Sequence, residues 1–250
     1  MKRTITAIAL ATVCGASFAG SSLTLEETNV LKYLVSEDIA VLKTGGGSIF
    51  MPTNADGSAP EETTVAKIEK AYSVNELKGN KAYKGKLVVI NGKAEEVSVV
   101  AFGGIQLALK ASNPYLPAMA SFKEQKGQQD ILENLGKGSK VQLLCECKGT
   151  TAGFLRFEDC QFTKYLAQKA QRRVDNALAK FDGGTTHDKL IDGIIRTSVQ
   201  ITGAMTEKNR ALCKTVQGAE KAYNNSLKTL KDSMEKAKVK NEARLKELGL

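Results

Sequence analysis

Residues 24–43 carry apolar side chains at the spacing of an amphipathic helix. Leu31, Leu34, Val35 and Leu42 fall on one face, and a Thr-Leu-Glu-Glu capping box begins the stretch. We therefore predict a helix that ends at the three consecutive glycines that follow.

The next stretch, residues 44–63, is rich in Gly, Ser, Pro, Asn and Asp, with one apolar tripeptide, Ile-Phe-Met. This composition predicts a linker or a long loop. Helical spacing returns over residues 64–82, where Ser73 and Glu76 have the spacing of a second capping box. We predict a second helix there.

From residue 86 the apolar spacing changes to the alternation of β-strands. Gly92 lies inside the first strand and would let it bend. A short helix, begun by Ser121-x-x-Glu124 and ending at Leu135, follows the third strand. The predicted strands cover residues 86–100, 105–110, 116–122, 141–147 and 154–162.

Three strands, a helix and a two-stranded hairpin are, in this order, the elements of an OB-fold barrel. Alternation alone would also permit other small barrels, so the order of the elements decides the interpretation. We predict an α+β protein: a five-stranded OB-fold Greek-key barrel with flanking helices and a long C-terminal helical region.

The C-terminal part of the chain returns to helical spacing, and its last stretch resembles a coiled-coil seam. Apolar residues recur there at steps of three or four, from Leu212 to Ala237. One continuous helix would be about 60 Å long and would need a partner along its seam. That partner is either the preceding helices or another chain, through residues 206–250. The predicted helices cover residues 165–181, 188–204 and 206–248.

The first 19 residues have the form of an export signal. Lys2 and Arg3 precede an apolar stretch, and small residues suit cleavage after Ala19. We expect a periplasmic or secreted protein, with a lipid anchor through Cys14 as the less favoured alternative. No later apolar run is long enough to span a membrane, so we expect no transmembrane segment in the mature chain. The predicted domains are a signal peptide (1–19), an N-terminal helix and linker (20–63), an OB-fold domain (64–163) and a helical C-terminal region (164–250).

The sequence offers little catalytic or metal-binding chemistry. Cys145 and Cys147 form a Cys-x-Cys pair, and the single histidine, His187, lies in a different segment. The triple glycine is not followed by the Lys-Ser/Thr of a phosphate loop. We find no nucleophile–base pair or carboxylate dyad, and we therefore expect no metal, no cofactor and no enzymatic activity.

The net charge of +9 is unevenly distributed along the chain. Residues 163–250 hold 18 Lys and Arg against 10 Asp and Glu, whereas residues 20–162 hold 16 against 17. The predicted barrel is thus close to neutral, and the positive charge lies on the C-terminal helices. Because single-strand-binding OB domains combine a basic groove with stacking aromatics, this distribution only weakly supports nucleic acid as a partner.

Several short motifs resemble those of a known family. They are Asn75-Glu76, Tyr83-x-Gly85-Lys86, Leu135-x-Lys137-Gly138-x-x-Val141, Cys147-Lys148-Gly149 and Asp159-Cys160. Together they are similar to the tRNA_anti-like OB-fold family over roughly residues 65–163. The resemblance implies an OB fold in an exported or lipid-anchored bacterial protein that binds nucleic acid.

The resemblance also implies a disulfide between Cys147 and Cys160. Cys145 would share a strand face with Cys147 and is the competing partner, and Cys213 is left buried or unpaired. The predicted function is that of an exported, non-catalytic OB-fold protein that binds nucleic acid or another anionic or oligomeric ligand. A structural protein that self-associates or docks a partner through its long C-terminal helix is the alternative. The candidate ligand-binding residues are Tyr83, Lys86, Gln106, Lys110, Tyr115 and Arg156.

Overall fold

The computed structural model describes residues 23–100, 104–113, 115–123, 125–181 and 186–250. The predicted signal peptide and Cys14 lie outside these residues. The chain forms two compact units, one made of the residues up to Val30 together with Ala179–Leu250, and the other of Leu31–Leu178. The sequence-based boundaries after residues 63 and 163 stay predictions.

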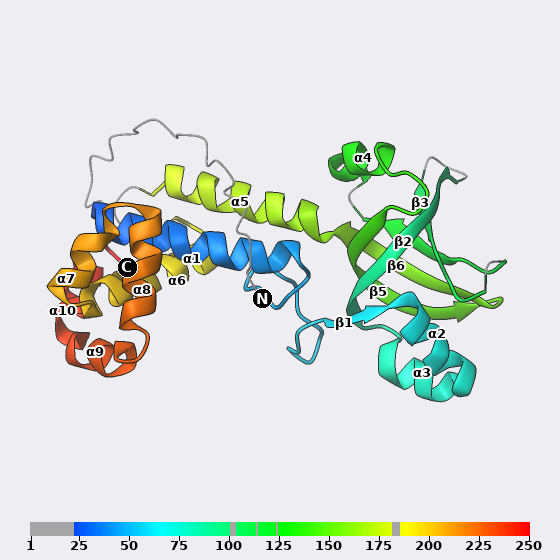
Figure 1. The fold of residues 1–250 in the computed structure, drawn as a ribbon, viewed down its shortest axis with the longest axis horizontal. Helices are drawn as coiled ribbons and strands as arrows, with labels where there is room; N and C mark the ends of the chain where they lie inside the picture. Colours follow the sequence, from blue (N-terminus) through cyan, green and yellow to red (C-terminus); the bar gives the residue numbers. More distant parts are fainter. Residues whose placement is uncertain (1–22, 101–103, 114, 124, 182–185) are drawn as a thin grey trace. The chain divides into compact units, whose positions relative to one another are not determined.

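The Leu31–Leu178 unit contains the β-barrel (Figure 1). Helix α1 (Leu25–Lys43) begins before this unit and leads into it. The predicted capping box is present, because the backbone N–H of Thr24 donates to the side chain of Glu27 at 2.8 Å and that of Glu27 donates to the side chain of Thr24 at 3.1 Å. The remaining elements of this part of the chain are β1 (Glu61–Thr64), α2 (Val65–Val74), α3 (Glu76–Tyr83), β2 (Leu87–Val99), β3 (Ile105–Leu109), β4 (Ala118–Phe122), α4 (Gln125–Glu133), β5 (Lys140–Thr151), β6 (Phe154–Phe162) and α5 (Thr163–Ala179).

The strands are ordered β1-β2-β3-β4-β6-β5, and a further pairing of β2 with β5 closes the last five into a barrel. Within the barrel only β4 and β6 run parallel. This topology confirms the predicted α+β OB-fold. The short strand β1 pairs in parallel with β2 outside the barrel, in a stretch where the sequence predicts a linker.

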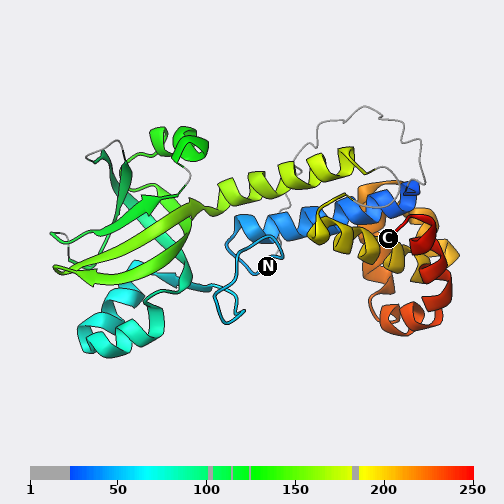
Figure 2. The same cartoon turned by 180° about the vertical axis from the view of Figure 1, so that it is seen from behind.

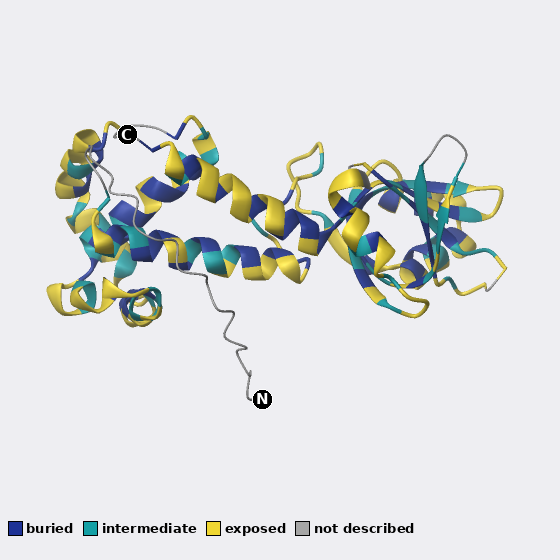
Figure 3. Cartoon of the chain, turned by 90° about the horizontal axis from the view of Figure 1, so that it is seen from above, coloured by how far each residue is buried: buried dark blue, intermediate teal, exposed yellow. Residues whose placement is uncertain are grey.

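The barrel encloses the inward side chains of each strand, as the alternating pattern predicts. Figure 3 shows buried positions along the strands and exposed positions over the loops and outer helices. Gln128 of α4 is fully buried, and its amide donates to the carbonyl oxygen of Cys160 at 3.5 Å and accepts from the backbone N–H of Phe162 at 2.8 Å. These bonds attach α4 to β6. The largest fully buried barrel side chains are Phe157, Ile90, Leu107, Leu109 and Leu143.

The predicted helix over residues 64–82 is divided in two. The backbone of Asn75 is extended, and its side chain accepts a hydrogen bond from the N–H of Lys78 at 3.0 Å. Asn75 therefore ends α2 and caps α3, so the caps are Thr64 and Asn75 rather than the predicted Ser73–Glu76 box.

The disulfide links Cys145 to Cys160, so the predicted pairing of Cys147 with Cys160 is wrong. Two register shifts interrupt the pairing of β5 with β6. They cancel each other, so beyond the second shift Cys160 lies beside Cys145, as the register at the turn requires, with their Cα atoms 4.1 Å apart, while Cys147 lies opposite Phe157. Asp159 has a φ of 52° next to this irregularity, as is common in a β-bulge. Cys147 stays a buried free thiol.

The other unit is helical (Figure 2), and the predicted continuous helix over residues 206–248 is wrong. The side chains of Thr206 and Thr215 cap new helices by accepting from backbone N–H groups three residues ahead. The resulting short helices fold back, and α9 and α10 contact α6. No continuous heptad seam remains in this stretch, and Leu212 and Leu227 are exposed. The elements are α6 (Lys189–Ala204), α7 (Glu207–Arg210), η2 (Ala211–Lys214), α8 (Val216–Ser226), α9 (Leu230–Lys236) and α10 (Lys238–Glu247).

Candidate ligand-binding surfaces

OB barrels bind ligands on the outer face of their second and third strands, which are β3 and β4 here. Two outward rows of residues cross these strands. In one row Ala108 pairs with Met119, and in the other Gln106 pairs with Ser121. We call these four residues the β3–β4 face. It carries no charge and no aromatic ring, because the large apolar side chains of both strands point into the barrel.

Arg156 extends the first row, because its position on β6 pairs with Met119 of β4. Its guanidinium donates to the carboxylate of Glu158 at 2.9 Å. The ammonium group of Lys148 likewise donates to the carboxylate of Glu146 at 2.6 Å, and this hydrogen bond raises the pKa of Lys148. The positive charges at this edge of the face are therefore largely neutralised.

Lys110 and Tyr115 lie at the β3–β4 connection, adjoining the β3–β4 face. Both are exposed, and Tyr115 is 87% exposed, the largest value among the exposed large hydrophobic residues. The backbone N–H of Ser112 donates to the Glu69 carboxylate of α2 at 2.8 Å, and that of Tyr115 donates to the side chain of Asn113 at 2.9 Å. These bonds fix the connection and leave the tyrosine ring in solvent.

The structure does not bring Tyr83 and Lys86 to this face. Tyr83 is only 6% exposed and belongs to the barrel core. Lys86 is exposed just before β2, whereas β2 first pairs with β3 at Ala94. Lys86 therefore lies eight residues before the first β2–β3 pair and outside the residues that form the β3–β4 face. Of the six candidates, Gln106, Lys110, Tyr115 and Arg156 border one surface.

A second surface escaped the sequence reasoning. Residues 65–86, which we call the α2–α3 cap, contain six lysines and two glutamates. The net charge summed over residues 20–162 conceals this local excess of positive charge, whereas the net charge of a shorter stretch reveals it. All six lysines are exposed, and only Lys67 forms an ion pair that the structure resolves, with Glu61 at 2.7 Å.

Two buried side chains of the barrel, Cys147 and Tyr72, have pKa values above their ordinary range. Burial raises the pKa of the Cys147 thiol, which keeps it protonated, and mainly burial also raises the pKa of Tyr72 to about 12. No three His, Cys, Asp or Glu side chains among the described residues lie close enough to hold a metal ion together. None of the described helices has the length and apolarity needed to cross a membrane.

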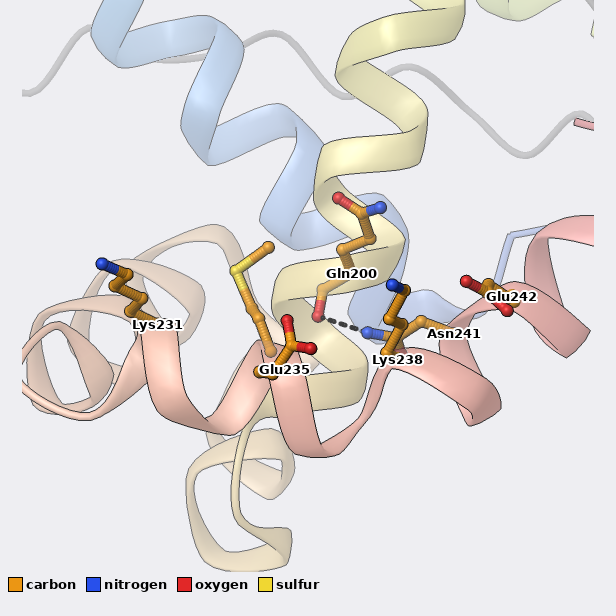
Figure 4. A pocket seen from close by; sticks show the side chains of 7 residues that line it. Gln200, Lys231, Glu235, Lys238, Asn241 and Glu242 are labelled. Atoms are coloured by element: carbon orange, nitrogen blue, oxygen red, sulfur yellow. Dashed lines mark hydrogen bonds between the residues drawn. The ribbon is translucent and has the colours of Figure 1, made fainter.

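The helical unit contains a hollow of about 370 Å³ (Figure 4). Asn241 lies at its base and donates to the backbone carbonyl of Gln200 at 3.2 Å. The charged side chains around it are two lysines and two glutamates, so it selects neither an anion nor a cation. The residues that line it are Gln200, Lys231, Met234, Glu235, Lys238, Asn241 and Glu242.

Comparison with models of protein families identifies a match. The model of the family described as tRNA_anti-like matches residues 5–161, which is more than half of the chain and includes the whole barrel up to the penultimate residue of β6. A search of curated proteins finds no match.

Proposed function

The chain belongs to the tRNA_anti-like family, and from this premise we propose that it is an exported, non-catalytic protein that binds single-stranded nucleic acid on its OB barrel. The nucleic-acid strand would cross the β3–β4 face, between the β3–β4 connection and Arg156. Fold alone does not decide function, so the proposal depends on the residues of this surface.

Tyr115 carries the proposal. Its ring is 87% exposed at the edge of the β3–β4 face, where an aromatic side chain can stack on a base. The amide of Gln106 lies on the same side of β3 and can donate to and accept from base edges. Its partner in the row, Ser121, is small and partly exposed, whereas Ala108 of the other row is 8% exposed.

Electrostatic attraction would contribute little at this surface. Lys110 is exposed, but Arg156 already contacts Glu158, so few phosphates can be neutralised. Each neutralised phosphate of a single strand adds about −0.7 to the slope of log K against log salt. We therefore expect a slope no steeper than about −1.4, corresponding to two contacts.

Fluorescence anisotropy of a labelled oligothymidine, titrated with the protein at several salt concentrations, tests the proposal. Tyr115→Ala should weaken binding about tenfold, because one stacked base contributes about 1–3 kcal/mol. Tyr115→Phe keeps the ring and should bind like the unchanged protein. Lys32→Gln, on the exposed side of α1, is the control for a lysine away from the face. No binding at low salt, or equal binding by Tyr115→Ala, refutes the proposal.

Export is supported by the charged and apolar pattern of residues 1–19. N-terminal sequencing of the protein from cell fractions should find a periplasmic or secreted chain that begins at Gly20. A chain that keeps Met1 and stays in the cytoplasm would contradict export.

Self-association through residues 206–250 loses its main support, because the helices of that stretch are short.

A further inference from the structure

The α2–α3 cap presents one fixed face to solvent. Ile68, Tyr72 and Tyr83 are buried in the barrel core. The ring of Tyr72 packs where a side chain at Gly79 would otherwise stand, and its hydroxyl donates to the side chain of Asn80 at 3.2 Å. These contacts lock the two helices together, so their remaining side chains are held outward.

Two aliphatic side chains stand at the corner between the helices. Val74 and Leu77, on either side of Asn75, are 71% and 79% exposed. Burial of these side chains in the core would be favourable, but Asn75, which caps α3, keeps them exposed to water. We call these two residues, three positions apart in the chain, the apolar tip of the α2–α3 cap.

The α2–α3 cap also carries exposed lysines. Lys70, Lys78, Lys81 and Lys84 are exposed, and none of them forms an ion pair with a residue that the structure describes. One exposed acidic residue, Glu76, lies between Val74 and Leu77 in the chain. The surface therefore combines free positive charge with exposed aliphatic carbon.

We propose that the α2–α3 cap docks the protein on an anionic phospholipid surface. The lysines meet the phosphates of the headgroups, and Val74 and Leu77 enter the boundary between headgroups and acyl chains. A nucleic acid offers the same phosphates, but its backbone has no apolar layer to receive two aliphatic side chains. The lipid surface is the partner that uses both features of the cap.

The absence of tryptophan from the chain permits a specific test. In the full-length protein, Leu77→Trp places a single tryptophan at the tip, and Val99→Trp places one at a matched site, since Val99 is 76% exposed on β2. Each variant is mixed with vesicles of phosphatidylcholine, with or without phosphatidylglycerol. We expect the emission of Leu77→Trp to shift to the blue only with phosphatidylglycerol, and that of Val99→Trp to stay unchanged.

Sedimentation with the same vesicles measures the two contributions separately. Lys78→Gln with Lys81→Gln should weaken binding about fivefold for each lysine removed, and added salt should have a similar effect. Val74→Ser with Leu77→Ser should weaken it about tenfold, whereas Val99→Ser should not. Lack of binding to anionic vesicles overturns the proposal. So does equal binding to neutral vesicles, or a lysine effect confined to oligothymidine, which would assign the cap to nucleic acid.

Discussion

The pairing of the cysteines leads to opposite expectations for two neighbouring substitutions. Cys145 and Cys147 are both fully buried on the inward side of β5, so replacing either by alanine removes one sulfur atom from the same core. Only Cys145 is bonded to Cys160. Cys147→Ala is therefore a matched control for the packing cost of Cys145→Ala.

The magnitude follows from the length of the closed loop. Cys145 and Cys160 are 15 residues apart, and on the chain-entropy model a loop of that length stabilises the folded state by about 3 kcal/mol. Loss of a buried sulfur costs about 1 kcal/mol in either variant. Cys145→Ala should thus lower the free energy of unfolding by about 4 kcal/mol, and Cys147→Ala by about 1 kcal/mol.

Urea unfolding followed by circular dichroism measures these differences, and a thiol count in denaturant identifies the bond. Cys145→Ala should gain one reactive thiol relative to the unchanged protein, and Cys147→Ala should lose one. Under reducing conditions the two variants should become about equally stable. Equal stability under oxidising conditions, or a thiol gained in Cys147→Ala, would refute the assigned pairing.

Three further perturbations test other parts of the fold by urea unfolding. Gly203→Ala should cost about 1–3 kcal/mol, because the new methyl group would overlap the side chain of Asn241, and Asn241→Ala should restore part of the loss. Arg244→Met should cost about 3 kcal/mol, because it leaves the buried carboxylate of Glu27 without the guanidinium that now donates to it at 3.0 and 3.1 Å. The raised pKa of Tyr72 contributes stability that is complete below pH 10 and is lost as the pH rises to about 12, so Tyr72→Phe should reduce the alkaline loss. An unchanged alkaline loss in that variant, or unfolding free energies within error of the unchanged protein in the other two, would contradict these contacts.

The order of the barrel strands follows from the sequence because alternation and turn residues are local signals. The strand Phe154–Phe162 is predicted with the bounds that the structure has. The disulfide is not predicted correctly, because the resemblance points to Cys147, whereas the tight turn at Ala152 and Gly153 pairs Thr151 with Phe154 and so sets the register in which Cys145 faces Cys160. The two register shifts between β5 and β6 cancel each other, and the alternating pattern of either strand alone does not reveal the register.

The C-terminal stretch shows a different limit of periodicity. The spacing from Leu212 to Ala237 identifies a helical period, but it does not say whether one helix continues through it. Thr206 and Thr215 begin new helices, and a Cβ at Gly218 would collide with the backbone oxygen of Leu212. The helix caps and the close approach of the chain at Gly218 determine where the helix is interrupted. Threonine is too common in sequences to predict such a cap by itself.

The sequence predicts the position of some of the candidate ligand-binding residues and not of others. Alternation in β3 correctly places Gln106 on the outward side, and the turn composition correctly leaves Tyr115 in a loop. Tyr83 is the last residue of α3, one residue beyond the predicted end of the helix, and its ring enters the core rather than the β3–β4 face. The lysines of the α2–α3 cap lie close together in the sequence, and the contact of α2 with α3 joins them into one cap.

The two proposed surfaces of the barrel unit differ in their physical basis, so salt separates them. The β3–β4 face is uncharged and would hold its ligand by stacking and hydrogen bonds, which salt affects little. The α2–α3 cap would hold its partner through free lysines, whose attraction weakens steeply as salt is added. At a salt concentration that releases the protein from anionic vesicles, oligothymidine should therefore remain bound. If both partners dissociate together and compete with each other, one basic surface serves both, and the neutral face has no ligand of its own.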